Sequence, residues 1–425
     1  MGGASLAYRS KAKEAPGPPL SYKEALAWLY SLQRFGIKLG LENVRRLIAE
    51  LGIDLALAHV IHIAGTNGKG SVCAMIDSIC RADNYRTGLF TSPHLVTFRE
   101  RIRVNGEMIS KDAVADGLTK ICNLVRDWDP HPTFFEITTA LALKSFSEAE
   151  IDVTILETGL GGRLDATNVI QSNVSVITSI ALDHQKWLGE SLDQIASEKA
   201  GIIKPQVPVV SAPQEKEVEL VLRKRAAECG SSIEFIAAPY EKHSTNLLGS
   251  YQKQNAALAL TAIRAAMIDI DDLAIAHGLS SVDWLGRFQR WDERTIIDGA
   301  HNPAAACILV ETWRETFGAQ RATLILAILS DKDLRGICEE LVPIADSVLL
   351  PQIRSERAAD PNQLAQILSM ITPSLPYSIT GSVAEALEIA HTKANPILLT
   401  GSLHFAGEAL AHLCGETGAF EECTQ

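Results

Sequence analysis

Apolar residues near the start of the chain recur at the spacing of an amphipathic helix. They occupy positions 25, 26, 29 and 32, Ser21 precedes them, and Glu24 follows Ser21 by three residues. A serine and a glutamate at this spacing form a capping box, which marks the first turn of a helix. A second helical pattern covers residues 41–51 and ends at Gly52. These two apolar patterns therefore predict two helices before residue 58.

After residue 58, short apolar runs alternate with helical patterns. The runs predicted as strands cover residues 59–64, 87–91, 152–157, 173–180 and 208–212. The helical patterns between and after them cover residues 71–82, 112–128, 135–147 and 254–267. Such alternation is typical of a parallel sheet that is covered by helices on both faces.

The alternation restarts after residue 288 with a second, shorter series. Its strands are predicted at 295–298, 322–328, 347–350 and 396–400, and its first helix at 304–316. A chain of 425 residues also exceeds what a single hydrophobic core usually organises. We therefore predict two α/β domains, over residues 1–285 and 286–425.

Composition and charge argue against several classes of protein. The formal net charge is −12, whereas a nucleic-acid-binding protein needs a basic face. No apolar run approaches the ~18–20 residues of a membrane span, and the first twenty residues lack the apolar stretch of a signal peptide. We therefore expect a cytoplasmic protein that binds neither nucleic acid nor membrane. A negative net charge still permits an anionic ligand, because a few local cations can override it.

One motif combines a strand, a glycine-rich loop and the start of a helix. Residues 64–71 have the sequence AGTNGKGS and follow the predicted strand at 59–64. In this setting backbone N–H groups and the helix N-terminus bind phosphates, and Lys69 neutralises the terminal ones. The spacing departs from the general pattern because Gly65 is too close to Gly68 and because Gly70 separates Lys69 from Ser71. A glycine turn without a ligand is the alternative. The predicted ATP contacts in this loop are Thr66, Asn67, Gly68, Lys69, Gly70 and Ser71.

This loop resembles the phosphate loop of the Mur ligase superfamily, and its extra glycine resembles that of the folylpolyglutamate synthase branch. Further blocks follow in that family's order: TSPHL at 91–95, TFFE at 133–136, LETGLGGRLDATN at 156–168, ALDH at 181–184, EKAG at 198–201, QNAA at 254–257, GRF at 286–288 and DGAHNP at 298–303. Together they span nearly the whole chain. The resemblance implies a P-loop parallel-sheet ATPase domain, a smaller C-terminal Rossmann-like domain, and a monomer.

The resemblance also implies a reaction. ATP, as co-substrate, phosphorylates a carboxylate of dihydropteroate or tetrahydrofolate, the amino group of L-glutamate attacks the acyl phosphate, and ADP and phosphate are released. Phosphoryl transfer depends mostly on positioning and charge neutralisation. The site is therefore expected to hold Mg²⁺, with two ions implied, and cationic side chains rather than a protein nucleophile.

Three residues are Mg²⁺ ligands by this resemblance: Ser92, Glu157 and His184. Glu157 ends a predicted parallel strand, where such sheets bind ligands, and carboxylate oxygen suits Mg²⁺. Taken singly, each has another interpretation: an ion pair or cap for Glu157, a structural histidine for His184, and a turn for Ser92. Lys199 resembles a lysine that CO₂ carbamylates, and an ordinary surface lysine is the alternative. The predicted catalytic residues are Lys69, Lys199 and His184.

The block around residue 165 resembles the part of the family that contacts the pterin. The residues that match are Thr133, Leu164, Asp165 and Ala166. A carboxylate at Asp165 can accept hydrogen bonds from adjacent N–H donors on such a ring. A loop aspartate that caps the next turn is the alternative.

On the second domain, Arg287 and Asp298 resemble nucleotide contacts, and Asn255 of the first domain joins them. A guanidinium suits phosphate because it offers paired, charge-assisted hydrogen bonds. An interdomain salt bridge is the alternative for Arg287, and a helix cap for Asp298; His301 and Asn302 are expected to be structural or to lie near the adenosine. ATP would lie between the domains, and their closure would exclude water from the acyl phosphate.

Other classes of protein explain fewer of these features. A cell-wall Mur ligase carries a separate N-terminal domain for a uridine nucleotide, and the phosphate loop here begins at residue 64, too early for one. A P-loop kinase or nucleotide switch explains Lys69 but not the block at 156–168. A non-catalytic nucleotide-binding module leaves the polar strand ends without a role. Within the family, an enzyme that only extends folylpolyglutamates stays open.

Overall fold

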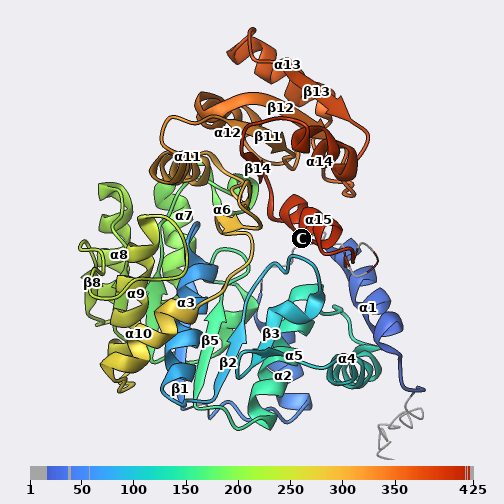
Figure 1. The fold of residues 1–425 in the computed structure, drawn as a ribbon. Coiled ribbons are helices and arrows are strands. Elements are labelled where there is room, and N and C mark those ends of the chain that lie inside the picture. Colours follow the sequence, from blue (N-terminus) through green and yellow to red (C-terminus); the bar gives the residue numbers. More distant parts are fainter. Residues whose placement is uncertain (1–16, 37–39, 57, 417, 419, 422–425) are drawn as a thin grey trace, which may run out of the picture.

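The chain forms two α/β bodies, each built on its own sheet, with the second drawn above the first in Figure 1. The structure is a computed structural model that describes residues 17–36, 40–56, 58–416, 418 and 420–421. The last helix before the second sheet ends at Ser281 and the first strand of that sheet begins at Gln289. The predicted two-domain α/β fold is confirmed, and the proposed division at residue 285 lies in this connection.

The first sheet has eight strands in the order β4-β3-β2-β5-β1-β6-β7-β8. β1 lies at its centre, parallel to β5 on one side and to β6 on the other. Val60 of β1 packs on the cluster that includes α2 and α5, whereas Ile61 and Ile63 pack on the cluster of α3 and α9. Burial on both faces explains why this strand is largely apolar. The strands are β1 His59–Ala64, β2 Thr87–Phe90, β3 Ile102–Val104, β4 Glu107–Met108, β5 Val153–Glu157, β6 Val174–Ile177, β7 Val209–Ser211 and β8 Ile233–Phe235.

One edge of this otherwise parallel sheet is antiparallel, which the sequence pattern did not predict. β3 pairs antiparallel with both β2 and β4, whereas the strands from β2 to β8 across the rest of the sheet are parallel. Asn105 and Gly106 connect β3 to β4 with φ of 55° and 83°. A two-residue hairpin of type I′ needs positive φ at both positions, which Asn-Gly supplies at little cost.

The helices of the first domain cover both faces of the sheet. The predicted capping box is present at the start of α1, where Ser21 N donates to the Glu24 carboxylate at 2.8 Å. α3 begins inside the phosphate loop and packs against α9 and α10. The helices are α1 Tyr22–Ser31, α2 Glu42–Glu50, α3 Lys69–Ala82, α4 Lys111–Val125, α5 Phe134–Glu148, α6 Gln185–Leu188, α7 Leu192–Lys199, α8 Lys216–Glu228, α9 Tyr251–Ala265 and α10 Asp272–Ser281.

The second sheet has six strands in the order β13-β12-β11-β14-β10-β9, all parallel except β9. Its core centres on Trp313 of α11, which packs against Phe288 and Phe317. α11 is well capped: Asn302 accepts a hydrogen bond from Ala305 N, and a proline follows the cap. The strands are β9 Gln289–Arg290, β10 Thr295–Ile297, β11 Ala322–Leu326, β12 Ala345–Pro351, β13 Tyr377–Thr380 and β14 Ile397–Thr400; the helices are α11 Pro303–Phe317, α12 Leu334–Leu341, α13 Pro361–Ile371, α14 Val383–His391 and α15 Leu403–Leu413.

The C-terminal segment returns to the first domain. Glu421 accepts hydrogen bonds from the hydroxyl of Tyr22 at 3.0 Å and from that of Thr97 at 3.1 Å. Glu421 therefore lies beside α1, in the part of the C-terminal segment that the structure describes. On α15, a side chain at Gly407 would come within 2.0 Å of the Leu95 carbonyl, so the helix backbone itself packs on the first domain.

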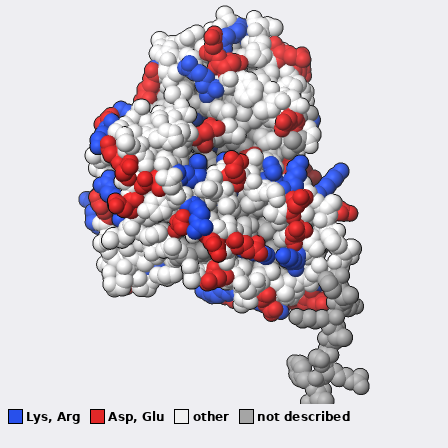
Figure 2. Space-filling model, turned by 60° about the horizontal axis from the view of Figure 1, so that its bottom comes forward, with Lys and Arg blue, Asp and Glu red and all other residues white. Residues whose placement is uncertain are grey.

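Charged side chains are interspersed over the face of the molecule shown in Figure 2. Acidic and basic groups alternate there, which gives that face no extended field of one sign. In the part of the chain that the structure describes, no helix has the length and apolar character needed to cross a bilayer.

Candidate active site

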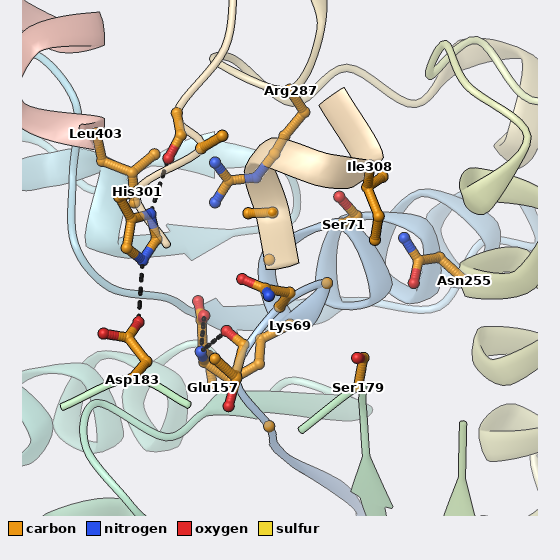
Figure 3. Close-up of a pocket in the computed structure, with 18 of the residues that line it drawn as sticks. Lys69, Ser71, Glu157, Ser179, Asp183, Asn255, Arg287, His301, Ile308 and Leu403 are labelled. Atoms are coloured by element: carbon orange, nitrogen blue, oxygen red, sulfur yellow. Dashed lines mark hydrogen bonds and ion pairs between the residues drawn. The ribbon is translucent and has the colours of Figure 1, made fainter. Parts of the chain in front are cut away.

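A cavity of about 390 Å³ lies between the two sheets, and most of its lining comes from the loops that follow strands. Loops after β1, β2, β5, β6 and β7 line it from the first domain, and the loop after β10, α11 and the first residue of α15 line it from the second. Ligands of open α/β sheets bind outside the carboxyl ends of the strands. Figure 3 shows side chains from both domains converging on this space. The position and the lining indicate a ligand site shared by the two domains.

The phosphate loop lies at the floor of the cavity, and the six predicted loop residues line it. Gly68 has φ of 93° and precedes the first residue of α3, so the helix N-terminus faces the cavity. The amides of Thr66 and Asn67 donate to the Ser179 carbonyl at 2.8 and 3.1 Å, which fixes the loop to the end of β6. Lys69 Nζ donates to the Thr66 carbonyl at 3.1 Å. This loop can bind an anion with backbone N–H groups and one ammonium.

The extra glycine of the loop has a steric reason. A Cβ atom at Gly70 would lie 2.6 Å from Nε1 of Trp284. Trp284 comes from the connection between the domains and packs against the first turn of α3. The departure from the general phosphate-loop pattern therefore allows an indole to approach the helix backbone.

The three predicted metal ligands, Ser92, Glu157 and His184, line the same cavity. The Glu157 carboxylate is 5% exposed, one oxygen accepts from Ser92 N at 3.1 Å, and the other lies 3.9 Å from Lys69 Nζ. Burial raises the pKa of Glu157, and Lys69 opposes that rise. Burial lowers the pKa of His184 to about 4, so its imidazole is neutral at pH 7. A carboxylate, a hydroxyl and a neutral imidazole are donors that suit a small divalent cation.

Protein side chains alone do not complete a metal site here. Within the described ranges, no three His, Cys, Asp or Glu side chains lie close enough together to hold an ion. Mg²⁺ usually keeps several waters and takes further oxygens from phosphates. The donor set therefore fits a cation that is bound together with a nucleotide.

Lys199 is buried at the end of α7 and reaches the phosphate loop. Lys199 is 5% exposed, and its Nζ donates a hydrogen bond to the Gly65 carbonyl at 2.7 Å. Burial, with a smaller effect from Lys69, lowers the pKa of Lys199 to about 7. The alternative of an ordinary surface lysine does not hold, because the amine lines the cavity rather than the solvent-exposed surface.

Asp183 joins the two domains beside the phosphate loop, and its interdomain partners were not predicted. Its carboxylate is 2.6 Å from Lys332 Nζ and 3.4 Å from Nε2 of His301, and it accepts from Asn302 Nδ2 at 3.2 Å. Hydrogen bonding and charge from His301, with Lys332, hold the pKa of Asp183 well below its usual range despite burial. Asn302 also exchanges amide hydrogen bonds with Asn67 at 3.1 and 3.2 Å.

These contacts hold the second domain against the phosphate loop. The sequence motif at 181–184 identified the loop that contains Asp183, but Lys332 lies 149 residues further along the chain. Only the assembled fold brings the two together.

The predicted nucleotide contacts Asn255, Arg287 and Asp298 also line the cavity. No ion pair joins Arg287 to another described residue, so the interdomain salt bridge is absent from this part of the chain, and its guanidinium points into the cavity in Figure 3. The Asp298 carboxylate accepts from Phe288 N at 2.7 Å and from Ala300 N at 2.8 Å. It shapes the loop after β10, while Asn302 rather than Asp298 caps α11.

None of the four predicted substrate residues belongs to the lining of the cavity, although Asp165 accepts hydrogen bonds from two lining residues, Gly159 and Leu160. Thr133 forms the capping box of α5 with Glu136, donating to its carboxylate at 2.9 Å. Asp165 is 5% exposed and caps the short helical turn that follows it, while Leu164 is only partly buried and Ala166 is buried. The alternative noted for Asp165, a cap on the next turn, is therefore present. Contact between these four residues and a substrate stays a prediction.

Two family models match the chain, one on each domain. The Mur ligase middle domain matches residues 63–228, and the Mur ligase glutamate ligase domain matches residues 286–403.

Proteins of known name match almost the whole chain. The dihydrofolate synthase/folylpolyglutamate synthase of Bacillus subtilis is 33% identical, over 91% of this chain and 98% of that protein. The protein of the same name from Escherichia coli is 36% identical, over 89% of this chain and 92% of that protein.

Solved structures share the fold. A Mycobacterium tuberculosis folylpolyglutamate synthase with ADP and AMPPCP has a TM-score of 0.83 at 32% identity, covering 93% of this chain and 99% of that one. E. coli FolC with DHPP and ADP has a TM-score of 0.82 at 32% identity, covering 96% and 99%. A bifunctional folylpolyglutamate synthase/dihydrofolate synthase with Mn, AMPPNP and L-glutamate has a TM-score of 0.82 at 30% identity, covering 93% and 100%.

Proposed function

This chain belongs to the dihydrofolate synthase/folylpolyglutamate synthase family of the Mur ligases, and we propose that its interdomain cavity carries out both reactions of that name. The chain is an ADP-forming ligase. It joins L-glutamate to dihydropteroate, forming dihydrofolate, and to the γ-carboxylate of tetrahydrofolate, extending a polyglutamate. The observation that carries this proposal is the cavity in which the phosphate loop, Glu157 and Arg287 meet from two domains.

The phosphate loop and Arg287 are proposed to hold the triphosphate. Lys69 neutralises the transferring phosphoryl group, because its ammonium lies at the N-terminus of α3 and 3.9 Å from the Glu157 carboxylate. Asn255 and Asp298 hold the nucleotide side of the cavity. Positioning and charge neutralisation supply most of the rate of phosphoryl transfer, so no protein nucleophile is needed.

Ser92, Glu157 and His184 are proposed to hold Mg²⁺. Two solved structures named as bifunctional folylpolyglutamate synthase/dihydrofolate synthase contain Mn together with AMPPNP, which supports a divalent ion beside the nucleotide. Such ions neutralise the charge that develops on the phosphoryl oxygens. We propose two ions, with His184 near the second.

Lys199 is proposed to be carbamylated. A pKa of about 7 leaves much of the amine neutral at physiological pH. Its lone pair then forms the N–C bond to CO₂, and the proton goes to solvent, which leaves a carbamate anion. This change replaces a cation near Lys69 with an anion that can help to hold the second metal ion.

The carboxylate acceptor is proposed to enter between the end of β5 and the start of α5. Thr133, Leu164, Asp165 and Ala166 border this side, and the E. coli relative is known with DHPP bound. The acceptor carboxylate would point toward Lys69 and the amino group of L-glutamate would approach from the second domain. A cytoplasmic location and a monomeric state stay predictions from the sequence.

The test is ADP release by the purified protein with Mg-ATP and L-glutamate, with dihydropteroate in one reaction and tetrahydrofolate in another. Turnover with both acceptors is the expected result. Turnover with tetrahydrofolate alone would leave a folylpolyglutamate synthase, the alternative within the family. No glutamate-dependent turnover with either, from folded protein that binds ATP, would contradict the folate assignment and favour another Mur-type amide ligase.

A further inference from the structure

A buried polar chain runs from the centre of the first sheet to the active-site loop. His62 lies on β1, 1% exposed, and its Nε2 is 2.8 Å from the hydroxyl oxygen of Thr167. That hydroxyl lies 2.5 Å from Oδ1 of Asp165. Oδ2 of Asp165 accepts from the amides of Gly159 and Leu160, each at 2.9 Å. Gly159 and Leu160 line the cavity two and three residues after Glu157.

Four donors of the protein itself surround the Asp165 carboxylate. Oδ1 accepts from both the amide and the hydroxyl of Thr167, and Oδ2 accepts from the two loop amides. Each carboxylate oxygen has two lone pairs, so four donors fill all four positions. Asp165 is also buried, at 5% exposed, so these four hydrogen bonds hold the carboxylate in one orientation.

The direction of each hydrogen bond in the chain follows from the donors that are present. A carboxylate with four donors around it only accepts, so the single hydroxyl hydrogen of Thr167 points to Asp165. The Thr167 oxygen must then accept from His62, which places the imidazole proton on Nε2. Nδ1 of His62 carries the lone pair and has no hydrogen-bond partner among the described residues. Burial lowers the pKa of His62 to about 3, which keeps this neutral form at physiological pH.

We infer that His62 and Thr167 are positioning residues for the ligase reaction, acting through Asp165 on the loop 159–161. His62 fixes the rotamer of Thr167, Thr167 orients the carboxylate, and the carboxylate holds the two loop amides beside Glu157. This inference rests on the proposed function for the meaning of the loop, and neither His62 nor Thr167 itself lies in the cavity lining.

The direct test needs no substrate. Amide hydrogen exchange at Gly159 and Leu160 is measured in the unliganded protein for Thr167→Val, His62→Leu and the double variant. We expect roughly tenfold faster exchange of these two amides in each single variant, because a hydrogen bond that holds their acceptor is lost. The double variant should exchange no faster than Thr167→Val alone, since His62 acts only through the Thr167 hydroxyl. Unchanged exchange in the single variants, or effects that add in the double variant, would overturn the inference.

Conservative variants and a matched control separate positioning from a loss of core packing. Thr167→Ser keeps the hydroxyl and His62→Gln keeps an N–H donor near the Nε2 position, so both should restore slow exchange. Thr154→Val removes a buried hydroxyl of neighbouring β5 that has no hydrogen-bond partner among the described residues, and it should leave the loop unchanged. Loop exchange that rises equally in Thr154→Val would indicate general loosening and contradict the relay.

Kinetics then connect the relay to the reaction. For Thr167→Val we expect the KM for the carboxylate acceptor to rise roughly tenfold and kcat to fall, with ATP affinity within about twofold of the parent protein, because the phosphate loop is untouched. An equal loss of ATP affinity would contradict a specific role for the loop. If the parent protein turns over no acceptor, the proposed function is contradicted. The exchange measurements need no substrate, so they would still test the relay independently.

Discussion

Two lysines meet at the phosphate loop in different environments. Lys69 is partly exposed and faces the Glu157 carboxylate. This position suits a side chain that stays close to the phosphoryl group during its transfer. Lys199 is enclosed and donates to the Gly65 carbonyl at 2.7 Å. Because burial lowers the pKa of Lys199 to about 7, its amine is the one that can react with CO₂.

Activity should depend on both CO₂ and pH through Lys199. Below pH 7 the amine is mostly protonated and cannot form a carbamate; above pH 7 the neutral form dominates. We expect protein kept in CO₂-free buffer to lose turnover and to regain it on addition of bicarbonate, more completely at pH 8 than at pH 6. ADP release measures this. Lys199→Ala should be inactive and partly rescued by a short carboxylate such as acetate; full activity of Lys199→Ala would contradict the role.

Glu157→Gln should change stability and activity in opposite directions. Burial raises the pKa of the Glu157 carboxyl, so the folded state resists its charge, and a neutral amide relieves that cost. We expect the unliganded variant to melt a few degrees higher, while kcat falls on the order of 100-fold because the charge is needed beside the phosphates. Thermal unfolding and ADP release check the two effects. Lower thermal stability of the variant would mean that the 3.9 Å contact with Lys69 outweighs desolvation.

At the scale of elements, prediction from sequence succeeded where the determining contacts are local. The capping box at Ser21 and the strand–loop–helix at the phosphate loop depend on residues within one or two turns, and both are present. The hairpin at Asn105 was missed although its Asn-Gly pair is a local signal, because the strands beside it have only three and two residues. The ion pair between Asp183 and Lys332 forms only where the two domains meet, so no pattern of neighbouring residues in the sequence indicates it.

Gly70, in the first turn of α3, is expected not to tolerate a side chain. Its replacement by alanine would bring Cβ within 2.6 Å of the Trp284 indole, which must then move. We expect Gly70→Ala to weaken ATP binding at least about fivefold and to lower stability by ~1–3 kcal/mol, as overpacking does. Calorimetric titration with ATP and denaturant unfolding measure both. Trp284→Leu should relieve the clash in the double variant; a double variant as impaired as Gly70→Ala would show that the indole is not the cause.

Around the active site, the polar contacts between the two domains differ in burial. Asp183 with Lys332 and Asn67 with Asn302 lie beside the phosphate loop and are largely buried. At the outer rim, the Ser250 hydroxyl donates to the Glu315 carboxylate at 2.6 Å, in an exposed position. Buried charge pairs cost more to break than exposed ones, so the inner contacts should set the relative position of the domains.

Removal of the inner charge pair should open the molecule and slow the reaction. Lys332→Met leaves the Asp183 carboxylate without its nearest cation, at 2.6 Å in the parent protein, and the second domain then loses its hold on the phosphate loop. We expect a larger radius of gyration in solution scattering with ATP and acceptor present, and glutamate-dependent kcat lowered on the order of tenfold or more. Glu315→Ala breaks an interdomain contact at the rim and should change neither quantity beyond about twofold, since exposed pairs contribute little. If both variants scatter and turn over like the parent protein, neither the closure of the domains nor the reaction depends on the ion pair between Asp183 and Lys332.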